Sequence, residues 1–588
     1  MNPPVEKSPL WTSRSTWVMI FLALLTALRL VFTGQIELSA DEAYYYQWSQ
    51  RLDWAYFSKG PGIAFAIRLA TELFGPSVSA IRFFSPMCGL GTSLLLFFLA
   101  RRLYGERVAV WTALMINCIP IFNVGSIVMT IDPLSIFFWT AALFTFWMAL
   151  EKSPQFSWFW PLTGVLIGVG FLAKYTNVVE VVSIILVLAL TRKYRRELLR
   201  PGFWMLLGAF IPFALPPIVW NSQHEWITIE HLSDRGNLNT PFGIHPSEFL
   251  NYFGQHAGVY SPLIFFGLLF AIYRAWPRAE IQFKVRYLLA FSLPLLVMYF
   301  LLAFKHAGEP NWTAPGFVSL GILAVAVWIE LGDAKVWARW FAGSALGLGI
   351  LLTTLMFNTD LVRSAGIHWS YDYDPGGKLL GWRSACEQVG EFRKDYEQKN
   401  GKPVFLIGSS YGMCSLLAYY MPEARSEMPG FPPVFIPESQ NIENQYSLWH
   451  RYDEMTDLTE VAKNALKTGD PASPSHKELG EAMEALPQDP GDDSEDALEA
   501  RQRFVAALLA VNPALPLDEF YTAEQGVNLF YGRDALYITD RDENHVPNSL
   551  KESFQATELV AQFDETRRGL PLRSIRIFAC HGYHSLPL

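Results

Sequence analysis

Two adjacent carboxylates, Asp41 and Glu42, follow directly on a long apolar segment that begins near Trp17. A carboxylate at a membrane surface is either a solvated loop residue or the base of an enzyme whose substrate is anchored in lipid. Because ionisable groups near membrane depth are energetically costly, they are candidates for a functional site. Further candidates stand beside apolar segments elsewhere in the chain: Lys59, Asp132, Lys174, Lys305 and Glu309.

Sugar transfer from a lipid phosphate would use both kinds of charge. An acceptor hydroxyl needs a positioned carboxylate that removes its proton as it attacks the anomeric carbon. The departing lipid phosphate gains negative charge, which nearby lysines stabilise. The aromatic run 44–46, which contains Tyr45, would stack on sugar faces or lie at the level of the lipid headgroups.

Each candidate also has an ordinary structural interpretation. Asp41 is compatible with a loop carboxylate at a helix end, and Lys59 and Lys305 with cations that extend to the membrane interface. Asp132 precedes Pro133 and suits the N-cap of the following helix. The functional interpretation therefore depends on all candidates lying on one face of the membrane.

The composition is that of a membrane protein. Of the 588 residues, 51% are apolar, and aromatic residues are frequent, with 20 Trp and 43 Phe. The five cysteines are isolated at positions 88, 118, 386, 414 and 580, which predicts neither a disulfide framework nor a zinc site. The net charge of −9 includes an acidic stretch at 487–500, and nothing in the sequence indicates a nucleic-acid partner.

The loops between the apolar segments alternate in charge. Arginines gather in one set, as in the run at 191–200, and the positive-inside rule places that set and the amino terminus in the cytoplasm. The carboxylates and lysines described above then lie on the outer face. About eleven segments are long enough to cross a bilayer, and the first is expected to be retained: 16–34, 80–100, 108–129, 133–150, 158–173, 176–191, 202–220, 258–273, 287–304, 313–331 and 338–356.

Two domains are expected: a membrane domain at 1–356 and an extracytoplasmic domain at 357–588. In the second domain a helix at 410–421 follows the first of several buried strands, which predicts a small α/β layer. The region near 452–520 is rich in Pro, Gly and acidic residues, and we expect an inserted, partly disordered excursion there. The predicted strands are 402–408, 534–539 and 574–580.

Several motifs resemble the bacterial branch of glycosyltransferase family 39. This branch includes the aminoarabinose and galacturonic acid transferases of lipid A, and it is related to the protein O-mannosyltransferases. The resemblance implies a GT-C fold, here an all-α bundle of membrane helices, with a polyprenyl-phosphate sugar donor, inversion at the anomeric carbon and a site on the outer face. The motifs lie between about 35 and 330: ADEAYY, FSKGPG, IRFFSP, MTIDPL, FLAKYT, WNSQHEW and EPNWTAPG.

Carried over residue by residue, the resemblance makes Asp41 the base and Glu42 its support or alternative. It gives Asp132 a part in acceptor binding or in orienting the site. Tyr45 and Glu309 are further expected substrate contacts. The cations that would hold the donor phosphate are Lys59, Arg82, Lys174 and Lys305.

The motif FSKGPG departs from the family's lysine–proline–proline pattern, because Gly60 follows Lys59, and this leaves the pose of Lys59 open. No metal and no cofactor are expected. The expected partners are a polyprenyl-phosphate sugar donor, the lipid bilayer and a cell-envelope acceptor, with a glycolipid favoured over a protein. The expected location is the bacterial inner membrane, with the second domain in the periplasm.

Two other classes of function are compatible with parts of the chain. GSSYG at 408–412 fits the G-x-S-x-G motif, and Asp540 and His581 follow in the order of an α/β-hydrolase triad. However, the domain offers few strands for a hydrolase core and no HGGG-type oxyanion loop. A transporter would be expected to show repeated halves and broken helices, whereas the sequence shows no repeat and its charges gather at one face.

Overall fold

The structure is a computed structural model, and it describes residues 13–239, 241, 243–374, 376–421, 424, 426, 431–439, 441–487, 494–513, 515, 527–540 and 545–584. The chain forms two compact units, Met1–Leu380 and Gly381–Leu588. Residues 357–380, which the sequence assigns to the second domain, group with the first unit. Each unit is described separately below.

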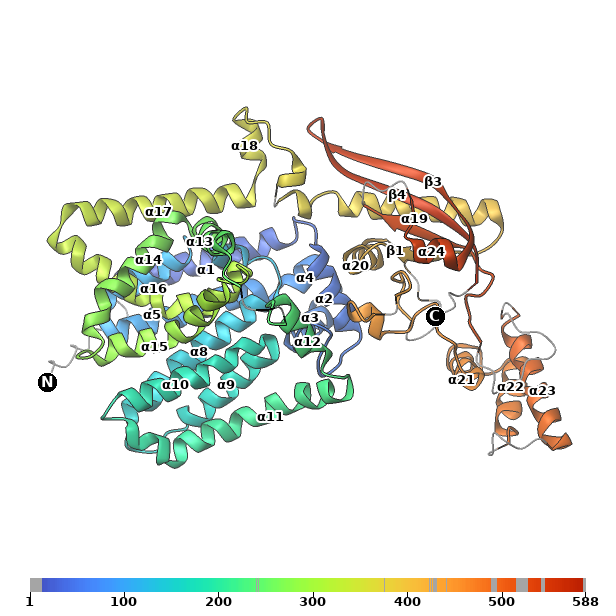
Figure 1. The fold of residues 1–588 in the computed structure, drawn as a ribbon, viewed down its shortest axis with the longest axis horizontal. Coiled ribbons are helices and arrows are strands. Elements are labelled where there is room, and N and C mark those ends of the chain that lie inside the picture. Colours follow the sequence, from blue (N-terminus) through green and yellow to red (C-terminus); the bar gives the residue numbers. More distant parts are fainter. Residues whose placement is uncertain are drawn as a thin grey trace. The chain divides into compact units, whose positions relative to one another are not determined.

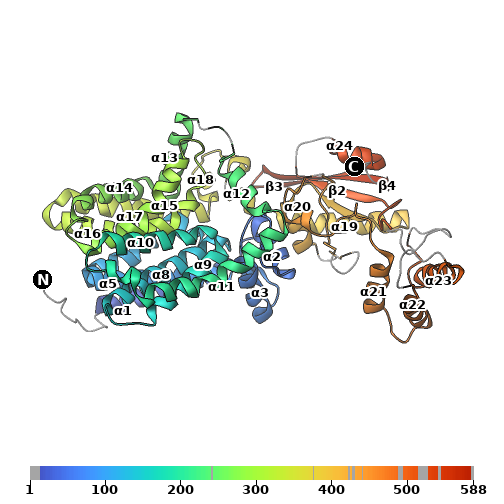
Figure 2. The ribbon, with the colours of Figure 1, turned by 60° about the horizontal axis from the view of Figure 1, so that its bottom comes forward.

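The first unit is helical (Figures 1 and 2). Its apolar segments form helices because backbone polar groups in lipid must be satisfied within the segment itself. Among the described residues, seven helical stretches are long and apolar enough to cross a membrane. They are α1 (Ser13–Thr33), the run of α4 (Val78–Arg82) and α5 (Phe84–Tyr104), α8 (Ile131–Lys152), α11 (Pro201–Gln223), α15 (Phe283–Leu302), α16 (Ala314–Ala334) and α17 (Val336–Phe357).

The predicted number of eleven spans is not confirmed, although helix is found in each predicted segment. An eighth span results if α13 (Pro246–Tyr260) and α14 (Pro262–Ala275), which are bent by 112° at their junction, count as one. The predicted span at 108–129 is broken, because a new helix starts at Pro120. The remaining apolar helices are shorter: α6 (Glu106–Ile116), α7 (Pro120–Val124), α9 (Phe159–Ala173) and α10 (Val179–Leu190).

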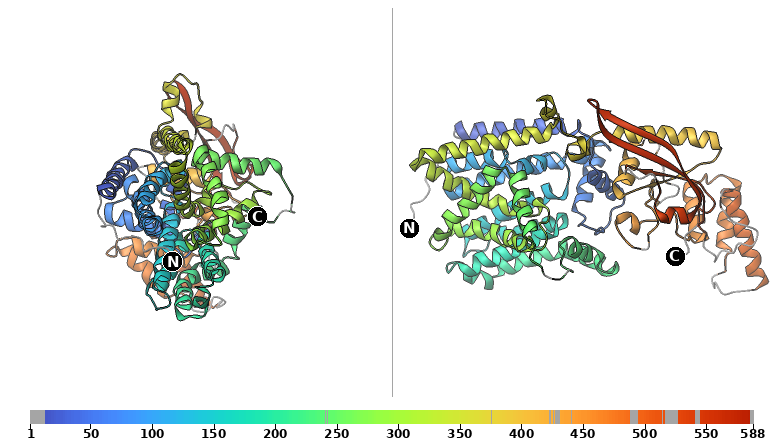
Figure 3. Two further views of the ribbon diagram at one scale, coloured as in Figure 1. Left: turned by 90° about the vertical axis from the view of Figure 1, so that its left-hand side faces the viewer. Right: turned by 45° about the horizontal axis from the view of Figure 1, so that its top comes forward.

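The loops of the first unit meet at two ends of a set of helices that run side by side (Figure 3). At one end the basic loops are joined by ion pairs with N···O distances of 2.6–2.8 Å: Arg102–Glu151, Arg107–Asp333 and Arg278–Glu330. At the other end Asp132 pairs with Lys174, and the Trp220 indole N–H donates to Asp53. The arginine-rich loops are thus separated from the carboxylates and lysines, as the charge alternation predicts.

Short helices cover the end that carries the carboxylates and lysines, which we call the outer end. Three of them concern the site: α2 (Ala40–Gln50), α3 (Gly62–Phe74) and α12 (Ile227–Arg235). Between the long helices lies an apolar core in which aromatic rings such as Phe146, Trp160 and Tyr287 are fully buried. This core holds the helix ends, and hence the outer loops, in fixed positions.

The second unit contains a four-stranded sheet in the order β1-β2-β4-β3. The strands β1 (Phe405–Gly408) and β2 (Ala535–Thr539) are parallel, whereas β4 (Leu570–Tyr583) is antiparallel to both β2 and β3 (Phe554–Arg567). Three of these strands and the helix α20 (Tyr411–Tyr420) confirm the predicted α/β layer. The strand β3 and the helix α19 (Trp382–Asn400) are additions that the sequence analysis did not identify.

The region at 452–520 contains more order than predicted. Its described parts include three helices, α21 (Leu458–Thr468), α22 (Pro474–Glu484) and α23 (Glu495–Val511). Their apolar faces are buried, with Leu479 and Phe504 fully enclosed. The prediction of partial disorder does not hold for these three helices, because charged residues on their outer faces concealed the apolar stripes in the sequence. Residues 488–493 of the acidic stretch lie outside the described residues.

The strand register separates Ser410 from His581. Gly408, two residues before Ser410, pairs with Ile538 near the end of β2. Cys580, next to His581, pairs with Ala535 at the start of β2. With a rise of about 3.3 Å per residue, the two side chains lie about 10 Å or more apart along the sheet.

The same residues have local partners instead. The Ser410 hydroxyl caps α20 by accepting a hydrogen bond from the Met413 N–H. The His581 ring lies against Asp534 and Glu558, with N···O distances of 3.3 and 3.4 Å, and Asp540 pairs with Arg573. The serine-hydrolase triad considered for this unit is therefore not formed.

Candidate active site

Asp41 and Glu42 occupy the first turn of α2 but face different environments. Ser39 caps this helix through a reciprocal pair of hydrogen bonds with Glu42. Successive residues in a helix point about 100° apart, and accordingly Glu42 is fully buried while Asp41 is exposed. The two adjacent carboxylates therefore lie in different environments.

The Glu42 carboxylate is held by Arg82, which is also fully buried. The Arg82 Nε and Nη2 atoms donate to the two Glu42 oxygens at 2.6 and 2.7 Å. The other three donors of the guanidinium group go to backbone carbonyls at 2.7–2.9 Å: Thr33, Ile36 and Glu37. All five N–H groups of Arg82 are thus used within the protein.

A third segment joins this buried pair. The Met129 N–H donates to Glu42 Oε1 at 2.8 Å, which ties the loop before α8 to the start of α2. Neither Glu42 nor Arg82 has a donor or acceptor left open toward the outer end. Glu42 was predicted to support or replace the base, and Arg82 to help hold the donor phosphate. In the structure both side chains are engaged within the protein, where they hold the start of α2 and with it Asp41.

Asp132 lies at the centre of a second polar group. Its carboxylate accepts from Lys174 Nζ at 2.7 Å and from the Asn311 side-chain amide at 2.8 Å. Lys174 Nζ also donates to the Asn311 carbonyl at 3.3 Å. The N-cap of α8 is Thr130, so the interpretation of Asp132 as the cap is wrong and its carboxylate is engaged at the outer end.

Lys59 lies in a tight turn in which it exchanges backbone hydrogen bonds with Tyr56. Its side chain is half-buried, and its pKa is lowered to about 8 by burial, and further by Arg235 and Lys174. Asp41 and Asp132 act in the opposite direction, so all of these charges are within electrostatic range of Lys59. We call this group the outer-end cluster: Asp41, Lys59, Asp132, Lys174 and Arg235.

Gly60 explains how the Lys59 turn reaches Lys174. A Cβ atom at Gly60 would lie 2.2 Å from the Leu172 carbonyl oxygen, and one at Gly62 would lie 2.8 Å from the Ala173 nitrogen. The turn therefore packs directly on the backbone at the end of α9, just before Lys174. The departure from the family's proline pattern thus permits a close approach of two backbones.

Arg235 is the member of the cluster that the sequence analysis missed. It lies at the end of α12, with Nη2 3.9 Å from Glu309 Oε1 and its guanidinium carbon 5.7 Å from the Trp312 ring centre. In the same helix, burial, Lys59 and Arg235 lower the pKa of His231 to about 4, so that this histidine is neutral at pH 7. The only signal in the sequence was a basic residue in an otherwise acidic outer loop.

Two further predicted substrate contacts, Lys305 and Tyr45, also lie outside this cluster. Lys305 Nζ donates to the carbonyls of Asn237 and Leu238 at 2.6 and 3.4 Å. The Tyr45 ring is buried in α2 with its centre 5.1 Å from that of Trp48. Direct contacts of Lys305 and Tyr45 with the substrate stay predictions.

The cluster combines an exposed carboxylate with three cations, which suits proton removal beside a phosphate. Asp132 fixes Lys174 and leaves Asp41 as the cluster's exposed acid. Among the described residues, no three His, Cys, Asp or Glu side chains are grouped so that they would ligate a metal ion.

The helical unit and the sheet unit define a multi-pass membrane protein of GT-C architecture. The fold is that of ArnT: a crystal structure of ArnT from Cupriavidus metallidurans bound to undecaprenyl phosphate aligns with a TM-score of 0.52 at 15% identity, over 98% of this chain and 100% of that one. Residues 58–220 match the model of the dolichyl-phosphate-mannose-protein mannosyltransferase family. This match supports the resemblance to family 39 that the sequence motifs indicate.

Two curated relatives have a higher sequence identity to this chain, over a smaller part of it. The chain is 30% identical over 312 residues to the lipid A galacturonosyltransferase RgtD of Rhizobium johnstonii, covering 53% of this chain and 63% of that protein. It is 27% identical over 286 residues to the undecaprenyl phosphate-alpha-4-amino-4-deoxy-L-arabinose arabinosyl transferase of Erwinia tasmaniensis, covering 46% of this chain and 50% of that protein. The matches thus span between half and two thirds of each relative.

Proposed function

We propose that this protein is a membrane glycosyltransferase that moves a sugar from a polyprenyl-phosphate donor to a glycolipid of the cell envelope. The observation that carries the proposal is the outer-end cluster, in which the exposed Asp41 lies within electrostatic range of Lys59. A carboxylate and several cations meet there on separate elements of a rigid helical unit. Such a site serves a reaction in which a hydroxyl loses a proton while a phosphate departs.

In the proposed reaction Asp41 removes the proton of the acceptor hydroxyl, whose oxygen attacks the anomeric carbon. The bond from that carbon to the phosphate oxygen breaks, its electron pair stays on the lipid phosphate, and the configuration inverts. Lys59, Lys174 and Arg235 stabilise the departing phosphate. Asp132 holds Lys174 at 2.7 Å and so fixes one of these cations.

The acceptor is proposed from the names of the relatives. One is a lipid A galacturonosyltransferase, and the other is named for an undecaprenyl-phosphate-linked aminoarabinose. These names favour a glycolipid such as lipid A over a protein acceptor, which is the alternative. They also differ in the sugar, so the proposal extends to a lipid-linked sugar without specifying which one.

The proposed location is the bacterial inner membrane, with the amino terminus in the cytoplasm and the outer-end cluster at the periplasmic face. The arginine-rich loops at the opposite end of the first unit support this orientation. The second unit follows α17, and we place it in the periplasm.

The proposal is tested by comparing lipid A from a wild-type strain with lipid A from a deletion strain. We expect the deletion to remove one uronic acid- or aminopentose-sized mass increment, and a plasmid-borne copy to restore it. Purified protein with polyprenyl-phosphate sugar should add the same increment to lipid A from the deletion strain. An unchanged lipid A profile together with a lost protein glycan would overturn the glycolipid assignment.

The lowered pKa of Lys59 predicts a pH dependence. Its ammonium group is charged below about pH 8 and loses that charge as the pH rises through this value. If it binds the donor phosphate, kcat/KM for the donor should fall over the same interval, because kcat/KM reports the free enzyme. We expect Lys59→Arg to move this fall to higher pH and Lys305→Arg to leave it in place. An unchanged profile in Lys59→Arg would contradict the assigned role.

A further inference from the structure

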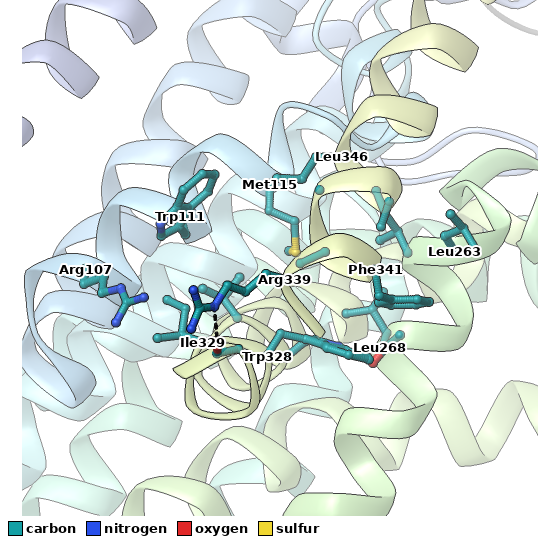
Figure 4. Close-up of a pocket in the computed structure, with 18 residues that line it drawn as sticks. Arg107, Trp111, Met115, Leu263, Leu268, Trp328, Ile329, Arg339, Phe341 and Leu346 are labelled. Carbon is teal, nitrogen blue, oxygen red and sulfur yellow. Dashed lines mark hydrogen bonds between the residues drawn. The ribbon is translucent and has the colours of Figure 1, made fainter. Parts of the chain in front are cut away.

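A cavity of about 350 Å³ lies at the end of the first unit opposite the outer-end cluster. It is lined by α6, α14, α16 and α17, it is open on one side, and most of its wall is apolar (Figure 4). Trp328 and Phe341 stack with ring centres 4.4 Å apart and form one part of this wall. The proposed sugar transfer uses none of these residues, so the cavity needs a separate explanation.

Two arginines stand at one end of this cavity. Figure 4 shows Arg107 and Arg339 on the side away from Leu263 and Phe341. Arg107 binds both oxygens of Asp333 at 2.8 and 2.9 Å, and Arg339 Nε donates to the Gly332 carbonyl at 2.5 Å. Two cations face one carboxylate, so this end of the cavity favours an anion.

The arginines also mark the level of the membrane surface. Both lie in the first turn of a helix, α6 or α17, beside the basic loops that the positive-inside rule assigns to the cytoplasm. Large aromatic side chains are exposed at the same end, including Trp276, Trp337 and Trp340, as expected where rings meet the headgroup region. An apolar space that begins at this level and is entered past two cations has the chemistry of a lipid-binding site.

Size and openness agree with an occupant of this kind. The cavity is within the range of small-molecule sites, about 300–1,000 Å³. Gly343 of α17 lines it, and a Cβ atom placed there would have no neighbour within 4 Å. Gly343 is exposed, so the wall at this position is open and is not covered by neighbouring side chains.

We propose that this cavity binds one anionic glycerophospholipid of the cytoplasmic leaflet. An acyl chain lies among the apolar side chains of α14, α16 and α17, and the phosphate lies at Arg107 and Arg339. The inference rests on the proposed orientation of the first unit and does not depend on the proposed sugar transfer.

The test uses the purified full chain in phosphatidylcholine vesicles and two photoactivatable probes. The probes are phosphatidylglycerol and phosphatidylcholine, each with the same diazirine-bearing acyl chain. We expect the phosphatidylglycerol probe to label peptides of α14, α16 and α17 more strongly, and unlabelled phosphatidylglycerol to compete. Replacing Arg107 and Arg339 by Gln should lower the phosphatidylglycerol labelling about fivefold per arginine.

Two glycines of the same helix provide a matched pair. Gly343→Phe fills the cavity and should abolish labelling of these peptides. Gly347→Phe, one turn later, also enters open space but does not line the cavity, and it should label like wild type. Equal labelling by both probes in wild type would overturn the proposal, as would wild-type labelling of Gly343→Phe. If Gly343→Phe does not fold, competition in the wild-type protein is the test. Unlabelled phosphatidylglycerol should then reduce the labelling more than unlabelled phosphatidylcholine does, and equal competition would overturn the proposal.

Discussion

Asp41→Asn should lose about 10²–10⁴-fold in kcat for sugar transfer, which is the usual contribution of a positioned general base. The amide has nearly the shape of the carboxylate but cannot accept the proton of the acceptor hydroxyl. Asp41 is exposed, while the neighbouring Glu42 carries the structural contacts, so the variant should fold normally. The measurement is turnover of the reconstituted variant with donor and acceptor in excess, alongside its thermal unfolding.

A matched control for this variant is Glu230→Gln, which removes an exposed carboxylate from α12, another helix of the outer end. It should turn over like wild type. Near-normal turnover of Asp41→Asn would place the base elsewhere, and a parallel loss in Glu230→Gln would point to the general charge of the outer end.

Glu42→Gln should chiefly reduce the amount of folded protein. The substitution leaves the Arg82 guanidinium buried without its counter-charge, and breaking a buried ion pair in this way typically costs about 3–5 kcal/mol. Arg82→Lys should also destabilise, because three ammonium donors cannot replace the five contacts of the guanidinium group. The measurements are thermal unfolding in detergent and the yield of monodisperse protein.

The contrast is the exposed ion pair between Arg68 and Glu72 in α3, whose nitrogen and oxygen are 2.6 Å apart. Glu72→Gln should change stability by no more than about 0.5 kcal/mol, since an exposed pair contributes little. A Glu42→Gln variant that is as stable as wild type but inactive would return Glu42 to the chemistry, as the resemblance first suggested.

Local patterns in the sequence were sufficient for most of the helices and for their order. Long apolar segments and alternating arginine-rich loops predict the two ends of the first unit because both signals depend only on neighbouring residues. The helices break at Pro120 and bend by 112° between α13 and α14, and the predicted number of spans is not confirmed there. In the second unit β3 was missed, since its largely exposed residues give no buried apolar run.

The site was predictable by residue type but not by role. Asp41, Lys59, Asp132 and Lys174 are brought together at one end, as the sequence indicates. However, adjacent carboxylates in a sequence look equivalent, and only the helical turn of α2 shows that Glu42 faces inward. The sequence likewise gave no sign that Arg82 has every donor engaged, or that Arg235 approaches from α12.

The contact between Met129 and Glu42 also constrains the order of events during biosynthesis. Glu42 meets Arg82 across 40 positions of the chain and the Met129 N–H across 87. The arrangement therefore cannot close until the ribosome has made the chain beyond Met129 and that loop has crossed the membrane. Until then the Glu42 carboxylate lacks one of its hydrogen-bond donors, the Met129 N–H. Asp41 thus acquires its final orientation only after the segments that carry Glu42, Arg82 and Met129 have assembled, so a nascent chain arrested before that point would contain the base without an organised site.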